Sequence, residues 1–309
     1  MNSSHLADAA RLIKEAVMTE GAYAVGIARA EAVDDEALTI YDRWIADCRH
    51  GLMNFAERYR DIRRDPRLLL DGAQTIVCAA FNYHHHSPDL GVAEYACGVD
   101  YHIVVRDRLG RAAAAIEAAL GGSTRVCVDS APIRERYWAR RAGLGFIGVN
   151  NHLIIPGAGS RFVLGEILWT GDAQADAPCA LSCGSCMACV KACPAGALRP
   201  DGSCDTSRCL SYLTIEHRGD LPAGTDLHGR LFGCDICLDA CPHNTRAPLS
   251  GLPEFAPSPT LAAYLAAMRR GHTPAVSFRA ATRATALTRL PLHQLLRNVK
   301  AGTHFLTQQ

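Results

Sequence analysis

The chain has 309 residues, and its length, composition and charge exclude several classes of protein. Hydrophobic residues make up 49% of the sequence and charged residues 20%, a globular composition that excludes a disordered chain, a collagen and a coiled coil. Lysine and arginine number 32 against 31 aspartates and glutamates, a formal charge of +1, so any nucleic-acid binding must rest on a local basic patch. No run of about 18 apolar residues is present, which argues against a transmembrane helix.

The first twenty residues predict an amphipathic helix. Apolar residues recur there at helical spacing, and acidic residues lie between them. The apolar set is Leu6, Ala9, Ala10, Ile13 and Val17, and the acidic set is Asp8, Glu15 and Glu20. This pattern does not fit a secretion signal or a twin-arginine leader. We therefore expect a cytoplasmic protein that does not associate with membranes.

Strand-like and helical patterns alternate as far as about residue 172. Short β-rich runs occupy 22–28, 75–83, 125–130 and 161–170. Helical stretches lie between them at Asp35–His50, Val105–Leu120 and Pro132–Ala142. The alternation predicts an α/β (α+β) domain in which helices cover both faces of a sheet.

Three regions follow from these patterns. Residues 1–172 form the α/β domain, and a cysteine-rich insert that begins with a linker at 172–178 extends over 173–250. Helical patterns return in the C-terminal segment, 251–309. We expect this segment to pack back onto the first domain or to cap the insert.

Fourteen cysteines are the strongest signal in the chain, and ten of them fall between Cys179 and Cys241. Clustered thiols in a reducing compartment indicate a metal or cluster site rather than disulfides. Residues 183–194 read C-x₂-C-x₂-C-x₃-C-P, the bacterial ferredoxin pattern for a [4Fe–4S] cluster. Residues 234–242 read C-x₂-C-x₃-C-P, and Cys209 completes a set of eight.

In two-cluster proteins the cysteine before the proline binds the other cluster. The pattern therefore predicts a first cluster on Cys183, Cys186, Cys189 and Cys241. It predicts a second cluster on Cys193, Cys209, Cys234 and Cys237. Zinc is the alternative, because it also binds CxxC pairs, and Cys179 or Cys204 are alternatives to Cys209. The four isolated cysteines are expected in the core: Cys48, Cys78, Cys97 and Cys127.

A two-cluster ferredoxin needs only about sixty residues, and here some 240 more are attached. We therefore expect the clusters to deliver electrons to a second redox centre in the larger domain. The alternative is an electron carrier that has two clusters and no substrate of its own.

Four longer segments resemble the epoxyqueuosine reductase family. They are VDSAPIRERYWARRAGLGFIGVNNHLII (128–155), YACGVDYH (95–102), SRCLSYLTIEHRG (207–219) and GRLFGCDICLDACPHN (229–244). The resemblance runs from about residue 20 to Asn298. The chain resembles the short form of the family, which lacks a C-terminal helical-repeat extension. It departs from the family pattern at Val149, where lysine is usual, and at His243, where tryptophan is usual.

The resemblance implies a particular reaction. Family members hold base-off cobalamin in the N-terminal domain beside two [4Fe–4S] clusters, and reduce epoxyqueuosine to queuosine in the tRNA wobble position. By resemblance, Asp129 of the VDSAP motif is the proton donor, and Asp100 and His102 line the pocket. The predicted partners are tRNA bearing epoxyqueuosine and an unidentified low-potential electron donor, and we expect a monomer. A related reductase with another substrate, similar to reductive dehalogenases, is the alternative.

Residues predicted to contact cobalamin are Arg58, Cys97, Gly143, Gly145 and Gly148. The three glycines belong to GLGFIG, which lacks the order of a dinucleotide-binding loop. They would let the backbone approach the corrin ring closely.

Elementary chemistry is consistent with the role of Asp129. Opening an epoxide produces an alkoxide that needs a proton, and a carboxylic acid with a raised pKa at the end of a strand is a suitable donor. The alternative is that Asp129 only caps a helix that starts at Pro132. His102 alone is also typical of a core or surface histidine, and His84–His86 of a solvated loop rather than a metal site.

Three groups of basic residues predict a phosphate-facing side. They are Arg58, Arg60, Arg63, Arg64 and Arg67; Arg134, Arg136, Arg140 and Arg141; and Arg269, Arg270, Arg279, Arg283, Arg289, Arg297 and Lys300. Solvated helix faces are the alternative for each group. Aromatic residues are only 6% of the chain, so one extruded base in a pocket fits better than a stacking platform.

Overall fold

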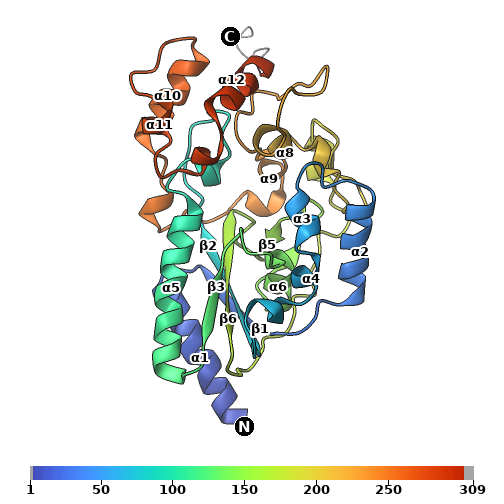
Figure 1. The fold of residues 1–309 in the computed structure, drawn as a ribbon, viewed down its shortest axis with the longest axis vertical. Helices are drawn as coiled ribbons and strands as arrows, with labels where there is room; N and C mark the ends of the chain where they lie inside the picture. Colours follow the sequence, from blue (N-terminus) through green and yellow to red (C-terminus); the bar gives the residue numbers. More distant parts are fainter. Residues whose placement is uncertain (1–2, 303–309) are drawn as a thin grey trace.

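A four-stranded antiparallel sheet forms the centre of the N-terminal half in the computed structural model, which describes residues 3–302 (Figure 1). The strand order is β1-β2-β6-β3. The strands are β1 (Ala24–Arg29), β2 (Thr75–Asn82), β3 (Thr124–Cys127) and β6 (Phe162–Trp169). All four correspond to strands expected from the sequence, although β3 stops three residues early. It stops because the chain turns at Asp129, which has a left-handed φ of 45°.

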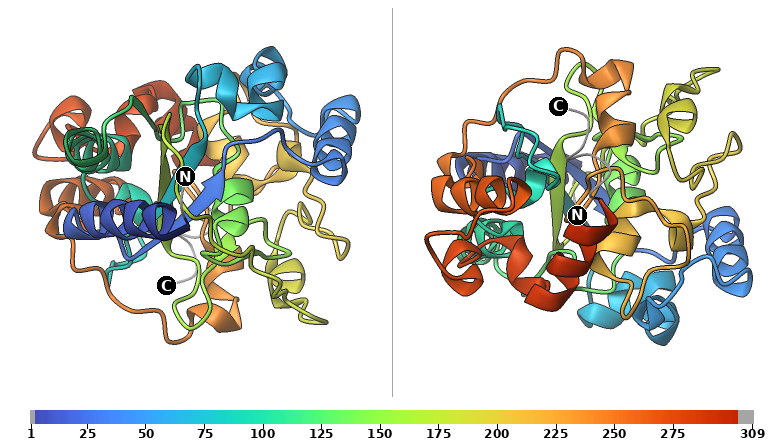
Figure 2. Two further views of the ribbon diagram at one scale, coloured as in Figure 1. Left: turned by 90° about the horizontal axis from the view of Figure 1, so that it is seen from below. Right: turned by 90° about the horizontal axis from the view of Figure 1, so that it is seen from above.

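Helices cover both faces of this sheet, as the sequence predicts (Figure 2). On one face α1 (Ser3–Thr19) and α5 (Tyr101–Leu120) pack side by side. Their apolar stripes meet strand residues such as Val77 and Ile167. On the other face α6 (Glu135–Arg141) buries Trp138 in a second core. The alternating sides of each strand thus feed two separate cores.

Three helix boundaries differ from the prediction. The second helix, α2 (Asp35–Ala46), ends four residues early, and three short helices follow it. These are α3 (Asn54–Arg58), α4 (Arg60–Arg64) and the 3₁₀ helix η1 (Pro66–Leu69). Helix α5 begins four residues early because the Asp100 carboxylate caps its first turn at the His102 N–H. The prediction that a helix starts at Pro132 is wrong, because residues 131–134 form a turn and α6 begins at Glu135.

A small hairpin, β4 (Phe146–Ile147) and β5 (Leu153–Ile154), follows α6 and was not predicted. The glycines of GLGFIG fit tightly there. A Cβ on Gly145 would stand 2.2 Å from the Ile154 carbonyl oxygen, and one on Gly143 2.6 Å from the Ala177 carbonyl oxygen. Close packing of the chain on itself therefore requires glycine at both positions.

The cysteine-rich region lies at one end of the sheet and consists of loops and short helices (Figure 1). Its helices are α7 (Ala188–Ala192), η3 (Thr206–Arg208), α8 (Leu210–Ile215), α9 (Ile236–Asp239) and η4 (Pro242–Asn244). The predicted linker before it is extended but anchored. The Asp176 carboxylate accepts from the Lys14 ammonium at 2.7 Å and from the Ile27 N–H at 2.9 Å.

The C-terminal segment packs against both other parts of the molecule. Its helices are η5 (Pro253–Phe255), α10 (Pro259–Arg269), α11 (Phe278–Ala281), η6 (Ala286–Arg289) and α12 (Leu292–Ala301). Leu287 and Leu295 share a core with Cys97, which follows η2 (Glu94–Ala96), and with Phe232 of the cysteine-rich region. Residues 303–309 of the predicted segment lie outside the described residues. Within residues 3–302, no helix combines the length and apolar character needed to cross a membrane.

Candidate functional site

Four cysteine side chains line one cavity in the cysteine-rich region. They are Cys183, Cys186, Cys189 and Cys241, from two segments more than forty residues apart. The β4–β5 hairpin closes one side, because a Cβ on Gly148 would stand 3.4 Å from the Cys183 Sγ. The His243 ring also lines the cavity and meets the Phe146 ring edge-on at 5.5 Å between centroids. The structure thus brings together the four thiols expected around the first cluster.

A second group of thiols stands close enough to interact electrostatically. Burial raises the pKa of Cys209, and the neighbouring Cys193 thiolate raises it further. Burial and Cys209 likewise raise the pKa of Cys234 to about 12. Burial, Cys234 and Cys209 also raise the pKa of Cys237. The pKa of Cys204 rises to about 11 through burial, Cys209 and Cys193. Cys204 therefore lies beside this group, and it stays an alternative to Cys209 as a ligand of the second cluster.

The isolated cysteines differ in burial. Cys78, Cys97 and Cys127 are buried, which confirms the core prediction for these three. Cys48 is exposed, so that prediction is wrong for Cys48. It lies in the turn after α2 with a left-handed φ of 53°, outside the apolar face of the helix.

An acid–histidine–acid chain lies at the end of the sheet that faces the cysteine-rich region. The His102 ring stands between two carboxylates: Nδ1 is 2.8 Å from Asp100 Oδ1, and Nε2 is 3.0 Å from Asp129 Oδ2. Helix α5 carries Asp100 and His102 at its first turn, and the β3–α6 loop carries Asp129. The Asp100 N–H donates to the Ala284 carbonyl at 2.7 Å, so the C-terminal segment also fixes this geometry.

The proton of this chain rests on the histidine. Hydrogen bonds to Asp100 and Asp129 raise the pKa of His102 to about 9, because an imidazolium can donate from both ring nitrogens. Burial opposes ionisation of Asp129, but the His102 cation outweighs it and holds the pKa of Asp129 below its usual value. The prediction of a raised pKa for Asp129 is therefore wrong, and Asp129 with His102 forms an ion pair that shares one proton.

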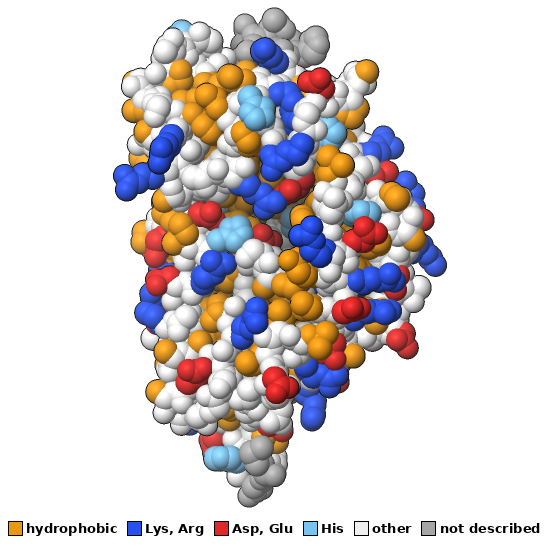
Figure 3. All heavy atoms as spheres, viewed as in Figure 1, with side chains coloured by type: hydrophobic (Ala, Val, Ile, Leu, Met, Phe, Trp, Pro, Cys, Tyr) orange, Lys and Arg blue, Asp and Glu red, His pale blue; other side chains and the backbone are white. Residues whose placement is uncertain are grey.

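The residues around the acid–histidine–acid chain, such as His152, are surrounded by protein but partly exposed to solvent, as residues in the wall of a cleft are. Burial and the Arg136 cation lower the pKa of His152 to about 4, although its ring is only half-buried. The Asp129 side chain is 46% exposed. Figure 3 shows a hollow in the middle of one face, with acidic, basic and histidine side chains around it. Such a hollow offers room for a ligand between the sheet and the thiol groups.

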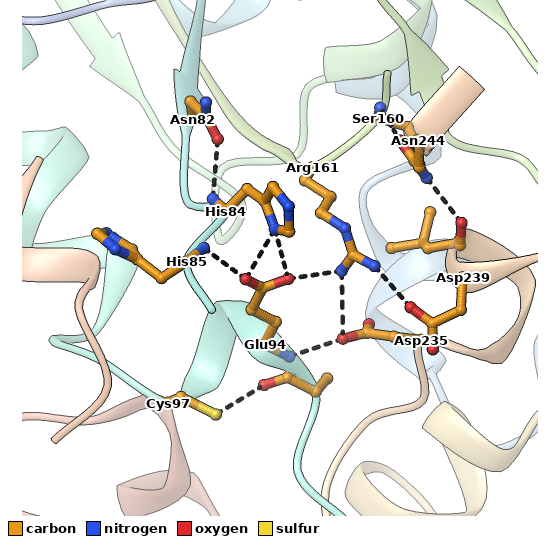
Figure 4. Close-up of polar contacts among 12 residues, drawn as sticks. Asn82, His84, His85, Glu94, Cys97, Ser160, Arg161, Asp235, Asp239 and Asn244 are labelled. Atoms are coloured by element: carbon orange, nitrogen blue, oxygen red, sulfur yellow. Dashed lines mark hydrogen bonds and ion pairs between the residues drawn. The ribbon is translucent and has the colours of Figure 1, made fainter. Parts of the chain in front are cut away.

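A buried network of charges joins the sheet to the cysteine-rich region (Figure 4). The Arg161 guanidinium donates to Glu94 Oε2 and to Asp239 Oδ1, each at 2.6 Å. The Glu94 N–H donates to Asp235 Oδ2 at 2.7 Å. Glu94 also accepts from the ring of His84, so the predicted solvated histidine loop is instead held in this network. Among residues 3–302, no three His, Cys, Asp or Glu side chains are arranged to hold a single metal ion.

Other predicted residues lie apart from the acid–histidine–acid chain. Arg58 ends α3, and the Cys97 Sγ lies 3.6 Å from the Ala93 carbonyl oxygen. Many basic residues have partners within the chain: Arg60 and Arg64 pair with Asp42, and Arg297 donates to three backbone carbonyls. The basic groups are therefore partly structural.

Sequence reasoning missed Glu135 and Glu166, which lie close to the same site. The signal for Glu166 was present, because it is the one acidic residue in the otherwise apolar strand FVLGEILW. An acidic residue in the middle of a buried strand is rare without a partner.

Taken with the paired thiol groups, the cleft defines an iron–sulfur oxidoreductase with a substrate site beside its electron-transfer module. Residues 182–244 match the family described as "4Fe-4S double cluster binding domain". Residues 63–130 match the family described as "Epoxyqueuosine reductase QueG, DUF1730".

Curated relatives cover most of the chain. An epoxyqueuosine reductase of Leadbetterella byssophila is 38% identical over 245 residues, which is 76% of this chain and 80% of that protein. One from Synechococcus sp. (strain CC9605) is 40% identical over 260 residues, 81% of this chain and 80% of that protein. The chain belongs to the epoxyqueuosine reductase family.

Solved structures agree with the fold. A crystal structure of epoxyqueuosine reductase with an epoxyqueuosine-modified tRNA-Tyr stem loop has a TM-score of 0.86 and 28% identity, and it covers 99% of this chain and 82% of that chain. The Bacillus subtilis epoxyqueuosine reductase has a TM-score of 0.84 and 27% identity, with the same two coverages. The mixed α/β domain with a double-cluster module is therefore confirmed.

Proposed function

We propose that this chain reduces epoxyqueuosine to queuosine in the wobble position of tRNA, with cobalamin and two [4Fe–4S] clusters as its cofactors. The observation that carries the proposal is the Asp100–His102–Asp129 chain together with two groups of thiols, which Arg136 links because it faces both Asp129 and Cys204. Family membership and the similarity to a structure that contains a tRNA stem loop support the choice of substrate.

Both clusters have a suitable set of ligands. Cys183, Cys186, Cys189 and Cys241 would hold the first cluster. Cys193, Cys209, Cys234 and Cys237 would hold the second. Cys237 also responds electrostatically to Cys189, so the two groups are neighbours, which suits transfer of electrons between clusters.

Cobalamin suits two unpaired donors, one on Arg134 beside the Tyr41 and Tyr137 rings and one on Asn150 at the cavity of the first thiol group. The Nη1 atom of Arg134 and the Nδ2 atom of Asn150 are buried and have no hydrogen-bond partner among the described residues. Such donors suit the amide groups around a corrin ring. The proposed contacts also retain Arg58, Cys97 and the three glycines predicted from the sequence. When bound, cobalamin supplies the low-potential cobalt centre that the clusters reduce.

The protein's own residues supply protons. Removal of an epoxide oxygen as water takes two electrons and two protons. Asp129 stands at the exposed end of the acid–histidine–acid chain and delivers a proton to the oxygen. His102 then returns a proton to Asp129 through the 3.0 Å contact between its Nε2 and Asp129 Oδ2. Asp100 orients the imidazole ring and stabilises its positive charge.

The partner proposals follow from the same chemistry. A single base extruded from the anticodon loop would enter the cleft, and basic side chains at its rim would contact phosphates. We further propose a cytoplasmic monomer that takes electrons from a low-potential donor protein.

The test is an assay on the nucleoside. The protein is reconstituted anaerobically with iron, sulfide and cobalamin, then incubated with a low-potential reductant and tRNA that contains epoxyqueuosine. Mass spectrometry of the digested tRNA should show loss of one oxygen from that nucleoside. Loss of halide from a halogenated phenol, with the tRNA unchanged, would instead support the dehalogenase-like alternative.

A further inference from the structure

Two acidic side chains behind Asp129 have no cationic hydrogen-bond partner among the described residues: Glu166 is buried, and Glu135 is partly exposed. Glu166 of β6 is 0% exposed, and both of its carboxyl oxygens lack a hydrogen-bond partner among the described residues. Glu135, the first residue of α6, accepts the Asp129 N–H at 2.6 Å through Oε1. A carboxyl group enclosed by protein and without a paired cation is more stable with its proton than without it.

Glu166 and Glu135 lie between the same elements. In the sheet, Glu166 is opposite Cys78 of β2 and Cys127 of β3, on the face that α6 covers. Electrostatic coupling joins Glu166 to Glu135 and Glu135 to Asp129. The groups that face Glu135 are Asp129, Arg136, His102, Tyr101, Glu166 and the thiols of Cys78 and Cys127.

Burial and the Asp129 charge raise the pKa of Glu135 to about 8, and they outweigh the lowering effects of the Asp129 N–H hydrogen bond and of the Arg136 and His102 cations. The pKa of Glu166 is also raised, by burial and by Glu135. At neutral pH the site therefore holds protons on His102 and Glu135, which both hydrogen-bond to Asp129, and a further proton on Glu166 behind them. His102 and Glu135 together hold the two protons that the reaction consumes.

We propose that Glu135 stores the second proton of the reaction and delivers it through Asp129. This inference rests on the proposed function. The first proton, shared by His102 and Asp129, goes to the oxygen as one C–O bond breaks. The Glu135 carboxyl proton then reloads Asp129, and this proton goes to the oxygen as the second C–O bond breaks and water leaves. The two electrons come from the reduced cofactors, a C=C bond remains, and solvent reprotonates Glu135 through the cleft.

Glu135 acts through Asp129, so it is a positioning residue for protons rather than a catalytic one. Behind it, burial and the charge of Glu135 raise the pKa of Glu166, because two neighbouring carboxyls do not readily ionise together. The hydrogen bond from the Asp129 N–H occupies one oxygen of Glu135 and leaves the other to carry the proton.

Infrared titration of the protein without cofactors tests the store independently of activity. The wild type should show the C=O stretch of a protonated carboxylic acid that disappears as the pH rises through about 8. Glu135→Gln keeps an oxygen to accept the Asp129 N–H and should lack this transition. Glu36→Gln, a change at an exposed position of α2, should retain it. A wild type without such a transition, or a Glu135→Gln protein that keeps it, would overturn the proposal.

Single-turnover rates on loaded enzyme test delivery of the proton. Glu135→Gln should retain both cofactors by absorption spectroscopy and remove the oxygen about 10²-fold more slowly than Glu36→Gln. The pH above which the rate falls should move from about 8 in the wild type to about 9 in Glu135→Gln, because His102 loses its proton there. An unchanged rate and pH profile in Glu135→Gln would overturn the proposal. An inactive wild type would overturn the proposed function instead, and the infrared titration alone would then decide the proton store.

Discussion

The buried network around Arg161 should be the most sensitive link between the sheet and the cluster module. The side chains of Arg161 and Glu94 are only 11% and 10% exposed, and their ion pair is 2.6 Å long. Arg161→Met removes the cation and leaves Glu94 and Asp235 as neighbouring buried acids. Loss of one partner of a buried pair costs about 3–5 kcal/mol. For a chain of 309 residues that lowers the melting temperature by roughly 5–8 °C.

Thermal unfolding of the cluster-loaded, anaerobic protein measures this change, after iron analysis has shown equal loading. Arg111→Met is the matched control. Arg111 also contacts two acids, Glu20 and Asp107, but its side chain is 48% exposed, so solvent screens the pairs and its loss should shift the melting temperature much less. The double variant Arg161→Met with Glu94→Met should regain part of the loss, because it removes a stranded acid. Equal shifts for Arg161→Met and Arg111→Met would refute the reasoning.

Three further predictions concern the clusters, the tRNA and the pH. Cys241→Ser should lower bound iron by about half, because it removes a ligand of one of two clusters. Cys179→Ser should leave bound iron unchanged. Equal iron in both variants would contradict the ligand assignment. Arg283→Ala should weaken tRNA stem-loop binding and reduce its salt dependence, because Arg283 is exposed next to the carbonyl that holds Asp100. Arg11→Ala, at an exposed position of α1, should do neither. Equal losses in the two variants would contradict a local basic patch. The pKa of His102 is raised from 6.5 to about 9, so its ion pairs stabilise the fold fully below about pH 6.5 and lose up to about 3 kcal/mol by about pH 9. Chemical denaturation across that range should show that the difference in free energy of unfolding between wild type and His102→Gln shrinks as the pH rises. A constant difference would contradict the assignment.

The first group of thiols could be predicted because its spacing is largely a local property of the chain. Cys183, Cys186 and Cys189 lie within seven residues, and the pattern itself indicates an exchanged partner such as Cys241. The structure then places these four thiols around one cavity. The strands were similarly accessible, since each is a short apolar run between turn residues.

Contacts between distant segments could not be predicted in this way. His102 and Asp129 are 27 residues apart, and only the family resemblance put both in one pocket. The pKa of Asp129 was wrong for the same reason, because its sign depends on a histidine from another element. The Arg161–Glu94 pair joins residues 67 positions apart, and no pattern in the sequence marks it.

For the basic residues, the sequence predicted more exposed positive charge than the fold provides. Their clustering predicted a phosphate-facing side, but Arg297 donates to the carbonyls of Leu213, His217 and Gly219. Sequence composition records charge, whereas the fold decides whether that charge faces solvent or holds a loop in place.

The central claim is that this chain removes the epoxide oxygen with electrons that pass through both clusters to cobalamin. The most direct measurement is the amount of queuosine formed, by mass spectrometry of digested tRNA, in paired reactions with and without cobalamin on the same cluster-loaded protein. We expect conversion only in the reaction with cobalamin, and we expect no conversion by Asp129→Asn protein that carries the same iron and cobalamin. Equal conversion without cobalamin, or none when clusters and cobalamin are both verified as loaded, would contradict it.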